Sequence, residues 1–401
     1  MDFLHKVKID KKVKEAKRVR LIGYYPYFIP LKEIHGSTVT YNGKKIIMAG
    51  SNNYLGLASD PRVKEASIKA IEKYGTTCSG SRFLNGTLEL HEELEHRLAK
   101  FVGKKAALVF TAGYLANLGS ISALISPNDH VFTDRYNHAS IMDGIFLAQG
   151  LKGTLNIHRF KHNDPQSLEK ALSEVPSAEP KIILTDGVFS MEGDIVKLPK
   201  IKKLADKYKA RIYLDEAHAI GMVGKTGRGT EEHYKVKNHA DFIMGTFSKS
   251  FASIGGFVAG DKDVIEFIKH SSRPLIFTAS MSPPHTAAVL KSLEIIENEP
   301  QHTRRLQEIA KKMIDGFSSL GFNIDVAETA IVPLITGEYT TTLRFWKALF
   351  DKGVYTNAVL PPAVAPNRAM IRTSYMSIHT DEELDKILEI AAKEGKKLKI
   401  I

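Results

Sequence analysis

Short apolar runs alternate with longer amphipathic stretches over residues 46–290. Each run is bounded by polar or glycine residues, a pattern that predicts buried strands. The predicted strands lie at residues 106–110, 130–133, 182–185, 212–214, 242–244 and 256–259. Strands that alternate with helices are typical of a mostly parallel sheet covered by helices on both faces. We therefore expect an α/β fold.

Helix-end signals support the helices between these strands. Asp60 followed by Pro61 predicts an N-cap and the first helical residue, and Gly75 predicts the end of the same helix. Thr87 is predicted to cap the next helix, which Gly103 ends. The apolar stripe between these two residues gives that helix one buried face.

The pattern changes after about residue 290, where longer helical stretches surround short strands near residues 331–335 and 370–373. This part is predicted to be a smaller α+β domain. The first 45 residues predict a helix and a short hairpin with its turn at residues 41–44. We expect three parts: an N-terminal segment at 1–45, a large domain at 46–290 and a small C-terminal domain at 291–401.

The composition is that of an ordinary soluble protein, with 401 residues, of which 43% are hydrophobic and 25% charged. Apolar runs fall short of the roughly 20 residues of a membrane span. Residues 1–6 lack the apolar core of a signal peptide. Cys78 is the single cysteine and cannot form an intramolecular disulfide. These features predict a cytoplasmic protein in a reducing compartment.

The net charge of +11 is partly local, because eight lysine and arginine residues lie within the first twenty. Three interpretations stay open: a solvated basic helix, attraction of a polyanionic substrate, or peripheral contact with an anionic membrane at its inner face. Nucleic acid is disfavoured as a partner, because the basic residues are not interleaved with aromatic residues.

Lys249 and Asp215 are the strongest chemical signal in the chain. Asp215 ends a predicted strand, and Lys249 follows 34 residues later in a turn of small residues. Pyridoxal phosphate needs a lysine that holds its aldehyde as a Schiff base and a carboxylate that keeps its ring nitrogen protonated. A carboxylate buried at a strand end needs a cationic partner, and a pyridinium nitrogen is one.

Other polar loops are predicted to meet at the same sheet edge, where ligands of open α/β sheets bind. Gly113 follows a strand and opens a helix, which suits a phosphate dianion but is also ordinary turn chemistry. Thr246 and Ser248 add hydroxyls beside Lys249. His138 follows another strand and either stacks on a cofactor ring or is a surface histidine. The polar loop at 186–194 borders the same crevice.

A zinc site at His91 and His96 is disfavoured. These histidines are five residues apart, which rotates them by about 140° on a helix and off a common face. We predict no metal site.

Taken together, these motifs resemble the α-oxoamine synthases, a family of pyridoxal-phosphate enzymes of fold type I. The resemblance covers nearly the whole chain, through residues 51–56, 80–82, 137–140, 186–193, 215–218, 245–249 and 371–372. Within the family, the branch of soluble bacterial serine palmitoyltransferases is most similar, at residues 25–28, 82–87, 245–257, 273–281 and 361–363. The resemblance implies a mostly parallel seven-stranded sheet sandwiched by helices, with a smaller C-terminal domain.

The resemblance also implies roles for individual residues. Lys249 is the Schiff-base lysine and general base, Asp215 pairs with the ring nitrogen, and His218 donates to the ring hydroxyl oxygen. His138 stacks on the ring. The remaining implied cofactor contacts are Gly113, Tyr114, Thr246, Ser248 and, across a homodimer interface, Thr278. The implied amino-acid contacts are Asn52, Ser81 and Arg372, with Arg372 pairing with the carboxylate.

The reaction implied is a decarboxylative Claisen condensation of L-serine with palmitoyl-CoA, which yields 3-ketodihydrosphingosine, CoA and CO2. Glycine C-acetyltransferase and 8-amino-7-oxononanoate synthase share every residue named and stay open as alternatives. A fold type I aminotransferase and a noncatalytic binding protein are the more distant ones. One departure concerns Leu360, since some bacterial serine palmitoyltransferases carry an arginine immediately before Pro-Pro-Ala.

Overall fold

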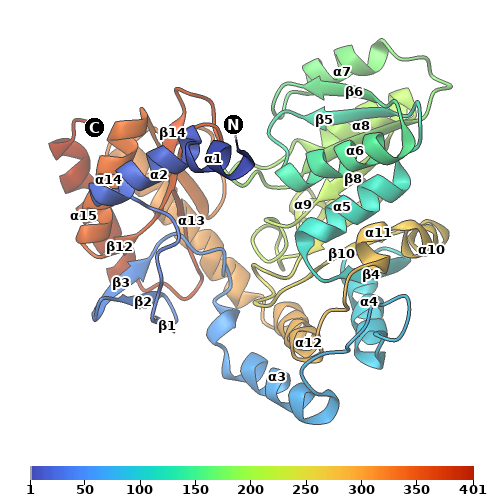
Figure 1. The fold of residues 1–401 in the computed structure, drawn as a ribbon, viewed down its shortest axis with the longest axis horizontal. Helices are drawn as coiled ribbons and strands as arrows, with labels where there is room; N and C mark the ends of the chain where they lie inside the picture. Colours follow the sequence, from blue (N-terminus) through green and yellow to red (C-terminus); the bar gives the residue numbers. More distant parts are fainter. Residues whose placement is uncertain (1) are drawn as a thin grey trace.

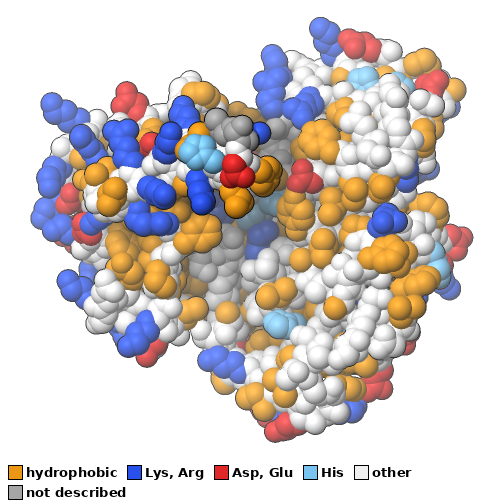
Figure 2. All heavy atoms as spheres, viewed as in Figure 1, with side chains coloured by type: hydrophobic (Ala, Val, Ile, Leu, Met, Phe, Trp, Pro, Cys, Tyr) orange, Lys and Arg blue, Asp and Glu red, His pale blue; other side chains and the backbone are white. Residues whose placement is uncertain are grey.

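The computed structural model describes residues 2–401, so residue 1 of the predicted N-terminal segment lies outside it. Two lobes lie on either side of a central opening, which is visible as a hollow in the space-filling view (Figure 1 and Figure 2). The right lobe contains a seven-stranded sheet in the order β4-β10-β9-β8-β7-β5-β6. Its strands are β4 (Ala106–Phe110), β5 (His130–Asp134), β6 (Asn156–Phe160), β7 (Lys181–Asp186), β8 (Arg211–Asp215), β9 (Phe242–Thr246) and β10 (Gly256–Gly260).

In the described chain, β10 runs opposite to the other six strands of this sheet. The prediction of a mostly parallel α/β sheet is therefore confirmed. β6 was missed as a strand, because it pairs only with β5 at the sheet edge and its residues are largely polar.

Helices cover both faces of the sheet, because successive strand residues point to opposite sides. On β8, Tyr213 packs with one set of helices, whereas Ile212 and Leu214 pack with the other. The first face holds α5 (Gly113–Leu124), α6 (Ala139–Lys152), α10 (Lys262–Ser271) and α11 (Arg273–Ile276). The second face holds α4 (Glu89–Phe101), α7 (Pro165–Ser173), α8 (Leu198–Tyr208) and α12 (Pro283–Asn298).

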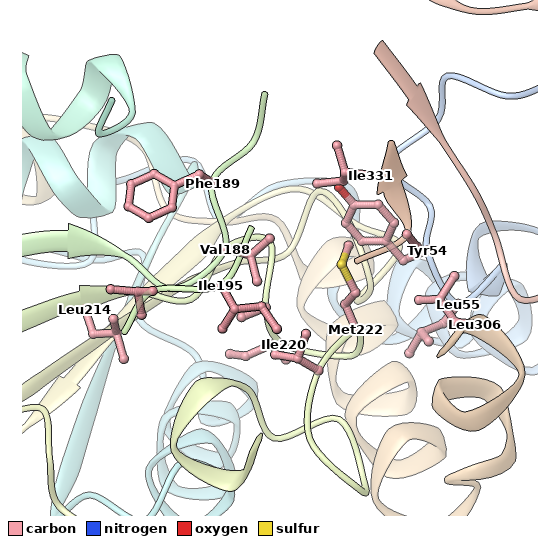
Figure 3. Packing of buried hydrophobic residues seen from close by; sticks show 14 of the residues in the cluster. Tyr54, Leu55, Val188, Phe189, Ile195, Leu214, Ile220, Met222, Leu306 and Ile331 are labelled. Carbon is pink, nitrogen blue, oxygen red and sulfur yellow. The ribbon is translucent and has the colours of Figure 1, made fainter. Parts of the chain in front are cut away.

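The core on the second face continues into the other lobe. Figure 3 shows Leu214 and Ile195 on the sheet side, and Tyr54, Leu306 and Ile331 on the side of the small lobe. These residues are buried in one contiguous apolar cluster. The two lobes are therefore held together by packed side chains beneath the opening.

The small lobe is built on a three-stranded antiparallel sheet of β11 (Ile331–Gly337), β14 (Ala369–Ser374) and β13 (Asn357–Val359). Its helices are α13 (Gln301–Ser319), α14 (Tyr339–Asp351) and α15 (Asp381–Lys397). The predicted strands near 331–335 and 370–373 are confirmed, whereas the short β13 was missed.

The N-terminal segment forms two helices, α1 (Phe3–Lys8) and α2 (Lys11–Leu21), where one was predicted. Asp10 separates them, because its side chain caps α2 by accepting from the Lys12 amide. A sheet of β1 (Glu33–His35), β2 (Thr38–Tyr41) and β3 (Lys44–Met48) comes next, with the predicted hairpin turn. Because β3 pairs in parallel with β12 (Val354–Tyr355), this sheet joins residues far apart in the chain. The division of the chain at residues 45 and 290 stays a prediction.

The predicted N-cap of α3 (Pro61–Tyr74) at Asp60 is confirmed, but the predicted cap at Thr87 is wrong. The Thr87 hydroxyl instead donates to the Arg82 carbonyl at 2.6 Å. Helix α4 therefore begins later, and the Leu88 amide donates to the imidazole Nδ1 of His91 at 3.0 Å. The remaining short helices are η1 (Leu57–Ser59) and α9 (Thr230–His233).

Candidate active site

A cavity of about 510 Å³ lies where the loops after β4, β5, β7, β8 and β9 meet the small lobe. Ten of the twelve predicted site residues line it: Asn52, Gly113, Tyr114, His138, Asp215, His218, Thr246, Ser248, Lys249 and Arg372. The parallel strands bring their carboxyl ends to one edge, so the loops converge as the sequence predicted.

Lys249 lies in the turn after β9 with its amine among charged neighbours. Burial lowers the pKa of Lys249 to about 8, with Arg372 adding to the effect and Asp215 and Asp186 opposing it. An amine with this pKa is partly neutral near neutral pH. It is therefore able to act as a nucleophile or a proton acceptor.

Asp215, at the end of β8, is held by two hydrogen bonds. Its Oδ1 accepts from the Ala217 amide at 2.8 Å, and its Oδ2 accepts from the Asn117 side chain at 2.6 Å. The same Asn117 amide donates to Ser140 Oγ at 2.9 Å and accepts from the Tyr213 hydroxyl at 3.0 Å. These two neutral donors orient the Asp215 carboxyl group in the cavity wall.

Asn117 was not predicted from the sequence. It lies one helical turn after Gly113 on α5, and that spacing was the available signal, because residues four apart share a helix face.

His218 is positioned by Tyr54, another residue that the sequence did not single out. The Tyr54 hydroxyl lies 2.7 Å from His218 Nδ1 and 3.2 Å from Asn52 Oδ1. Burial lowers the pKa of His218 well below its usual value, and the nearby Lys249 and Arg372 add to this. Burial also raises the pKa of Tyr54 to about 12, opposed by Arg372. The Tyr54 hydroxyl therefore links His218 to Asn52.

His138 is the N-cap of α6, which fixes its ring beside the cavity. Its Nδ1 accepts from the Ser140 amide at 3.3 Å and lies 2.7 Å from Ser140 Oγ. Burial lowers the pKa of His138, while Asp215 opposes the shift. Burial therefore favours the neutral ring, and the place of His138 in the cavity lining fits the predicted stacking role.

Asp186 is a further buried acid in the cavity wall that sequence reasoning placed only within a polar loop. Its Oδ2 accepts from the His138 amide at 3.2 Å, and its Oδ1 has no hydrogen-bond partner within residues 2–401. Burial raises its pKa well above the usual value, and the charges of Asp215 and Asp134 add to this. Ionisation of Asp186 beside the site is therefore disfavoured.

Gly113 and Thr246 form a close-packed corner of the cavity. A Cβ at Gly113 would lie 2.4 Å from Thr246 Oγ1, so only glycine fits. The Thr246 hydroxyl lies 3.0 Å from that of Ser248, and both face the N-terminus of the twelve-residue helix α5. Hydroxyls and free helix amides at such a corner suit a phosphate group. The residues of the cavity therefore fit pyridoxal phosphate at both its phosphate and its ring.

Arg372 reaches the cavity from β14 and is fixed on one side. Its Nε donates to the Ser190 carbonyl at 2.6 Å, and its Nη2 donates to Asn52 Oδ1 at 3.1 Å. Weaker contacts run from Nη2 to the Tyr54 hydroxyl at 3.4 Å and from Nη1 to Ser374 Oγ at 3.5 Å. Together these contacts hold the guanidinium plane in the cavity wall, where its planar donors suit a carboxylate ligand.

Ser81 and Thr278 do not line this cavity. Ser81 pairs with Ala279 in an isolated antiparallel bridge, and its buried hydroxyl has no hydrogen-bond partner in the described chain. Thr278 lies partly exposed beside that bridge. Their predicted roles in binding stay predictions.

A larger cavity, of about 1120 Å³, lies between the 222–238 loop and α13. Among the described residues that line it, none belongs to the predicted site. Within residues 2–401, no helix combines the length and apolar character that a membrane crossing requires.

Comparison with known proteins agrees with this geometry. Residues 44–390 match the family described as aminotransferase class I and II. The chain is 47% identical to a serine palmitoyltransferase of Bacteriovorax stolpii, covering 97% of this chain and 91% of the relative. It is 41% identical to an 8-amino-7-oxononanoate synthase of Thermoanaerobacter pseudethanolicus, covering 98% of each. A solved serine palmitoyltransferase of Sphingomonas wittichii superposes with a TM-score of 0.94 at 33% identity and covers 100% of both chains. A high-resolution structure described as SPT with the PLP internal aldimine superposes equally well, with a TM-score of 0.94 at 34% identity over the whole of both chains.

Proposed function

Since the chain belongs to the aminotransferase class I and II family, we propose that it is a pyridoxal-phosphate-dependent serine palmitoyltransferase of the α-oxoamine synthase type. The reaction is the decarboxylative condensation of L-serine with palmitoyl-CoA to 3-ketodihydrosphingosine, CoA and CO2. The observation that carries the proposal is the cavity that joins Lys249, Asp215 and Arg372 in a chain 47% identical to a serine palmitoyltransferase.

Each of these residues performs one step that the reaction needs. Arg372 binds the serine carboxylate through its guanidinium group, which the Ser190 carbonyl and Asn52 hold in place. When bound, pyridoxal phosphate supplies an electron sink for the carbanion formed at the serine Cα. Lys249 takes the Cα proton, since the pKa of about 8 leaves part of its amine neutral. Asp215 keeps the pyridine nitrogen protonated.

The two histidines and the Gly113 corner hold the cofactor. With the cofactor bound, His218 would donate to the ring hydroxyl oxygen, and His138 would lie against the ring face. Thr246 and Ser248, with the first amides of α5, bind the phosphate. Their packing keeps the ring fixed while bonds at Cα break, which favours one reaction course.

A panel of serine, glycine and alanine with acyl-CoA substrates of increasing chain length tests the proposal. We expect CoA release to be fastest with serine and palmitoyl-CoA, and Lys249→Ala to abolish it. Turnover with glycine and acetyl-CoA but not with serine would overturn the proposal. The 41% identity to an 8-amino-7-oxononanoate synthase makes alanine the informative third substrate.

We also propose a homodimer with active sites at the subunit interface, in which Thr278 completes the phosphate site of the other subunit. This arrangement gives a role to Thr278 and to Ser81, which lie outside the cavity of their own chain. Mixing inactive Lys249→Ala with a cofactor-deficient Thr278→Val variant tests it. Recovery of activity in the mixed dimer is expected, whereas independent sites within each chain would give none.

We further propose that the protein is cytoplasmic and contacts anionic membrane peripherally through α1 and α2. Lysine and arginine side chains gather over these helices (Figure 2). Phe3 and Leu4 are 74% and 61% exposed among them, a mixture that suits a lipid headgroup layer. Co-sedimentation with anionic vesicles should fall when residues 1–20 are removed, and equal binding with and without them would contradict the proposal.

A further inference from the structure

His162 bridges two buried aspartates beside the active site. Its Nδ1 lies 3.2 Å from Asp134 Oδ1, and its Nε2 lies 3.2 Å from Asp194 Oδ2. The carboxylates are 1% and 5% exposed, and the imidazole is 17% exposed. Asp134 ends β5, Asp194 belongs to the loop between β7 and α8, and His162 comes after β6. One side chain therefore links three strand-end loops.

The surroundings of His162 favour its charged form. Burial disfavours an imidazolium, but the hydrogen bond to Asp134 and the adjacent Asp194 carboxylate outweigh it and raise the pKa of His162 to about 10. The Tyr136 ring stacks on the imidazole at 4.6 Å, and the Phe189 ring packs edge-on at 4.4 Å. The face of the Tyr136 ring adds to the stabilisation of a cation on the imidazole.

The neighbouring Asn163 strengthens the same connection. Its backbone amide donates to Asp134 Oδ2 at 2.7 Å, and its side chain donates to Asp194 Oδ2 at 2.7 Å and to the Ile195 carbonyl at 2.9 Å. These bonds orient both carboxylates toward the imidazole. The imidazole and Asn163 therefore hold both carboxyl groups in place.

The loop fixed by this bridge is the one that positions Arg372. The Phe189 amide donates to the Asp194 carbonyl at 3.1 Å, which closes a tight turn around Ser190. The Ser190 carbonyl accepts from Arg372 Nε at 2.6 Å. Figure 3 shows Phe189, Val188 and Ile195 on this loop, with Val188 and Ile195 packed toward the core. Val188, Ser190 and Met191 line the cavity.

We propose that His162 is a positioning residue for the amino-acid substrate: as an imidazolium between Asp134 and Asp194, it fixes the 186–195 loop whose Ser190 carbonyl aims Arg372 at the substrate carboxylate. The proposal rests on the proposed function, because it takes Arg372 as the carboxylate ligand.

The charges around the bridge indicate the effect of losing the imidazolium. Without it, Asp134 and Asp194 become uncompensated buried charges, with the buried Glu192 on the same loop. Arg368 lies 4.0 Å from Glu192 and pairs with Asp325, so it does not replace the lost cation. Breaking a buried ion pair by removing one partner leaves a strongly unfavourable charge, and the loop relieves it by moving. Arg372 then loses its carbonyl support.

The test compares His162→Gln and Asp194→Asn with wild type, and His158→Gln serves as the matched control. His158 lies on β6 and stacks on Phe132 at 4.6 Å without touching the loop. Hydrogen–deuterium exchange of residues 187–195 is measured on cofactor-free protein. Serine affinity is measured on cofactor-loaded protein by the absorbance change that serine causes without acyl-CoA.

We expect faster exchange of 187–195 in both bridge variants and a rise of about tenfold in the KM for serine, with kcat within about threefold of wild type. The control should match wild type in both measurements. The double variant His162→Gln/Asp194→Asn, which removes one carboxylate together with the cation, should recover part of the serine affinity. Unchanged exchange and unchanged serine KM in His162→Gln would overturn the proposal. If His162→Gln does not fold, Asp194→Asn alone is measured: faster exchange and a higher serine KM are expected, and unchanged values of both would overturn the proposal.

The two proposals fail in different ways. A wild type that turns over another amino acid overturns the proposed function, yet the exchange of 187–195 still reports on the bridge. A serine-active wild type with an unaffected His162→Gln variant overturns the positioning role alone.

Discussion

Asn117→Leu tests how the hydrogen bonds of Asn117 hold Asp215 in the cavity wall. The substitution keeps the branched shape of the side chain and removes the hydrogen bonds to Asp215, Ser140 and Tyr213. A bond to a charged group contributes about 1.5–3 kcal/mol, and a neutral bond contributes about 0.5–1.5 kcal/mol. We therefore expect Asn117→Leu to lower the free energy of unfolding by about 4 kcal/mol.

Tyr213→Phe provides the reference for this experiment. It removes the hydroxyl that bonds to Asn117 and to Ser120, at 3.0 and 2.7 Å, but leaves Asp215 with both of its donors. We expect it to cost about 2 kcal/mol, since only neutral bonds are lost. The remaining difference of about 2 kcal/mol belongs to the bond between Asn117 and Asp215.

Urea denaturation of cofactor-free protein measures both losses, and a cofactor titration measures the functional consequence. Asn117→Leu should weaken pyridoxal phosphate binding by about tenfold or more, whereas Tyr213→Phe should weaken it far less. If the two variants lose the same stability to within about 0.5 kcal/mol, the amide does not hold Asp215 and the reasoning is wrong.

Three further predictions concern the rest of the cavity. Cofactor-free protein should take up pyridoxal phosphate at a rate that rises with pH through about 8, because Lys249 attacks only when it is deprotonated. A midpoint near the ordinary lysine pKa of about 10.4 would contradict the proposed environment. Gly113→Ala should weaken cofactor binding by about tenfold, because its Cβ would lie 2.4 Å from Thr246 Oγ1, while Gly150→Ala, which meets open space, should bind normally in the same titration. Arg372→Lys should raise the KM for serine by about 10- to 100-fold, because an ammonium cannot replace the fork that Ser190 and Asn52 orient; an unchanged KM in steady-state assays would remove Arg372 from carboxylate binding.

The sequence predicted the elements that obey strong local rules. Strands such as β4 and β8 contain continuous apolar runs because helices bury both of their faces. The predicted bounds match those of β4 fully and differ from those of β8 by one residue at each end. β6 at the sheet edge and the short β13 lack such a run. The predicted cap at Thr87 is wrong because the Thr87 hydroxyl donates to the backbone carbonyl of Arg82.

The site residues also divide into those that local sequence predicts and those that it does not. Lys249, Asp215 and Gly113 lie at strand ends or turns, where local sequence predicts a chemical role. Tyr54 has no such local sign: it is important because it lies 2.7 Å from His218, a residue 164 positions later. The sequence gives no local signal for His162 either, because both of its partners come from other loops. Residues that position the chemistry are defined by contacts, and contacts between distant segments leave no periodic pattern.

Leu360 illustrates how the structure resolves a difference from some relatives. Asn357 and Val359 line the cavity from β13, and the alternation of a strand turns Ala358 and Leu360 to the opposite side. Leu360 is buried there against Val19 of α2, in an apolar cluster that holds the N-terminal helix on the small lobe. An arginine in that orientation would bury an unpaired charge, so leucine suits this packing. Among the described residues that line the cavity, Arg372 is the only arginine, and carboxylate recognition therefore depends on how firmly its loop contacts hold it.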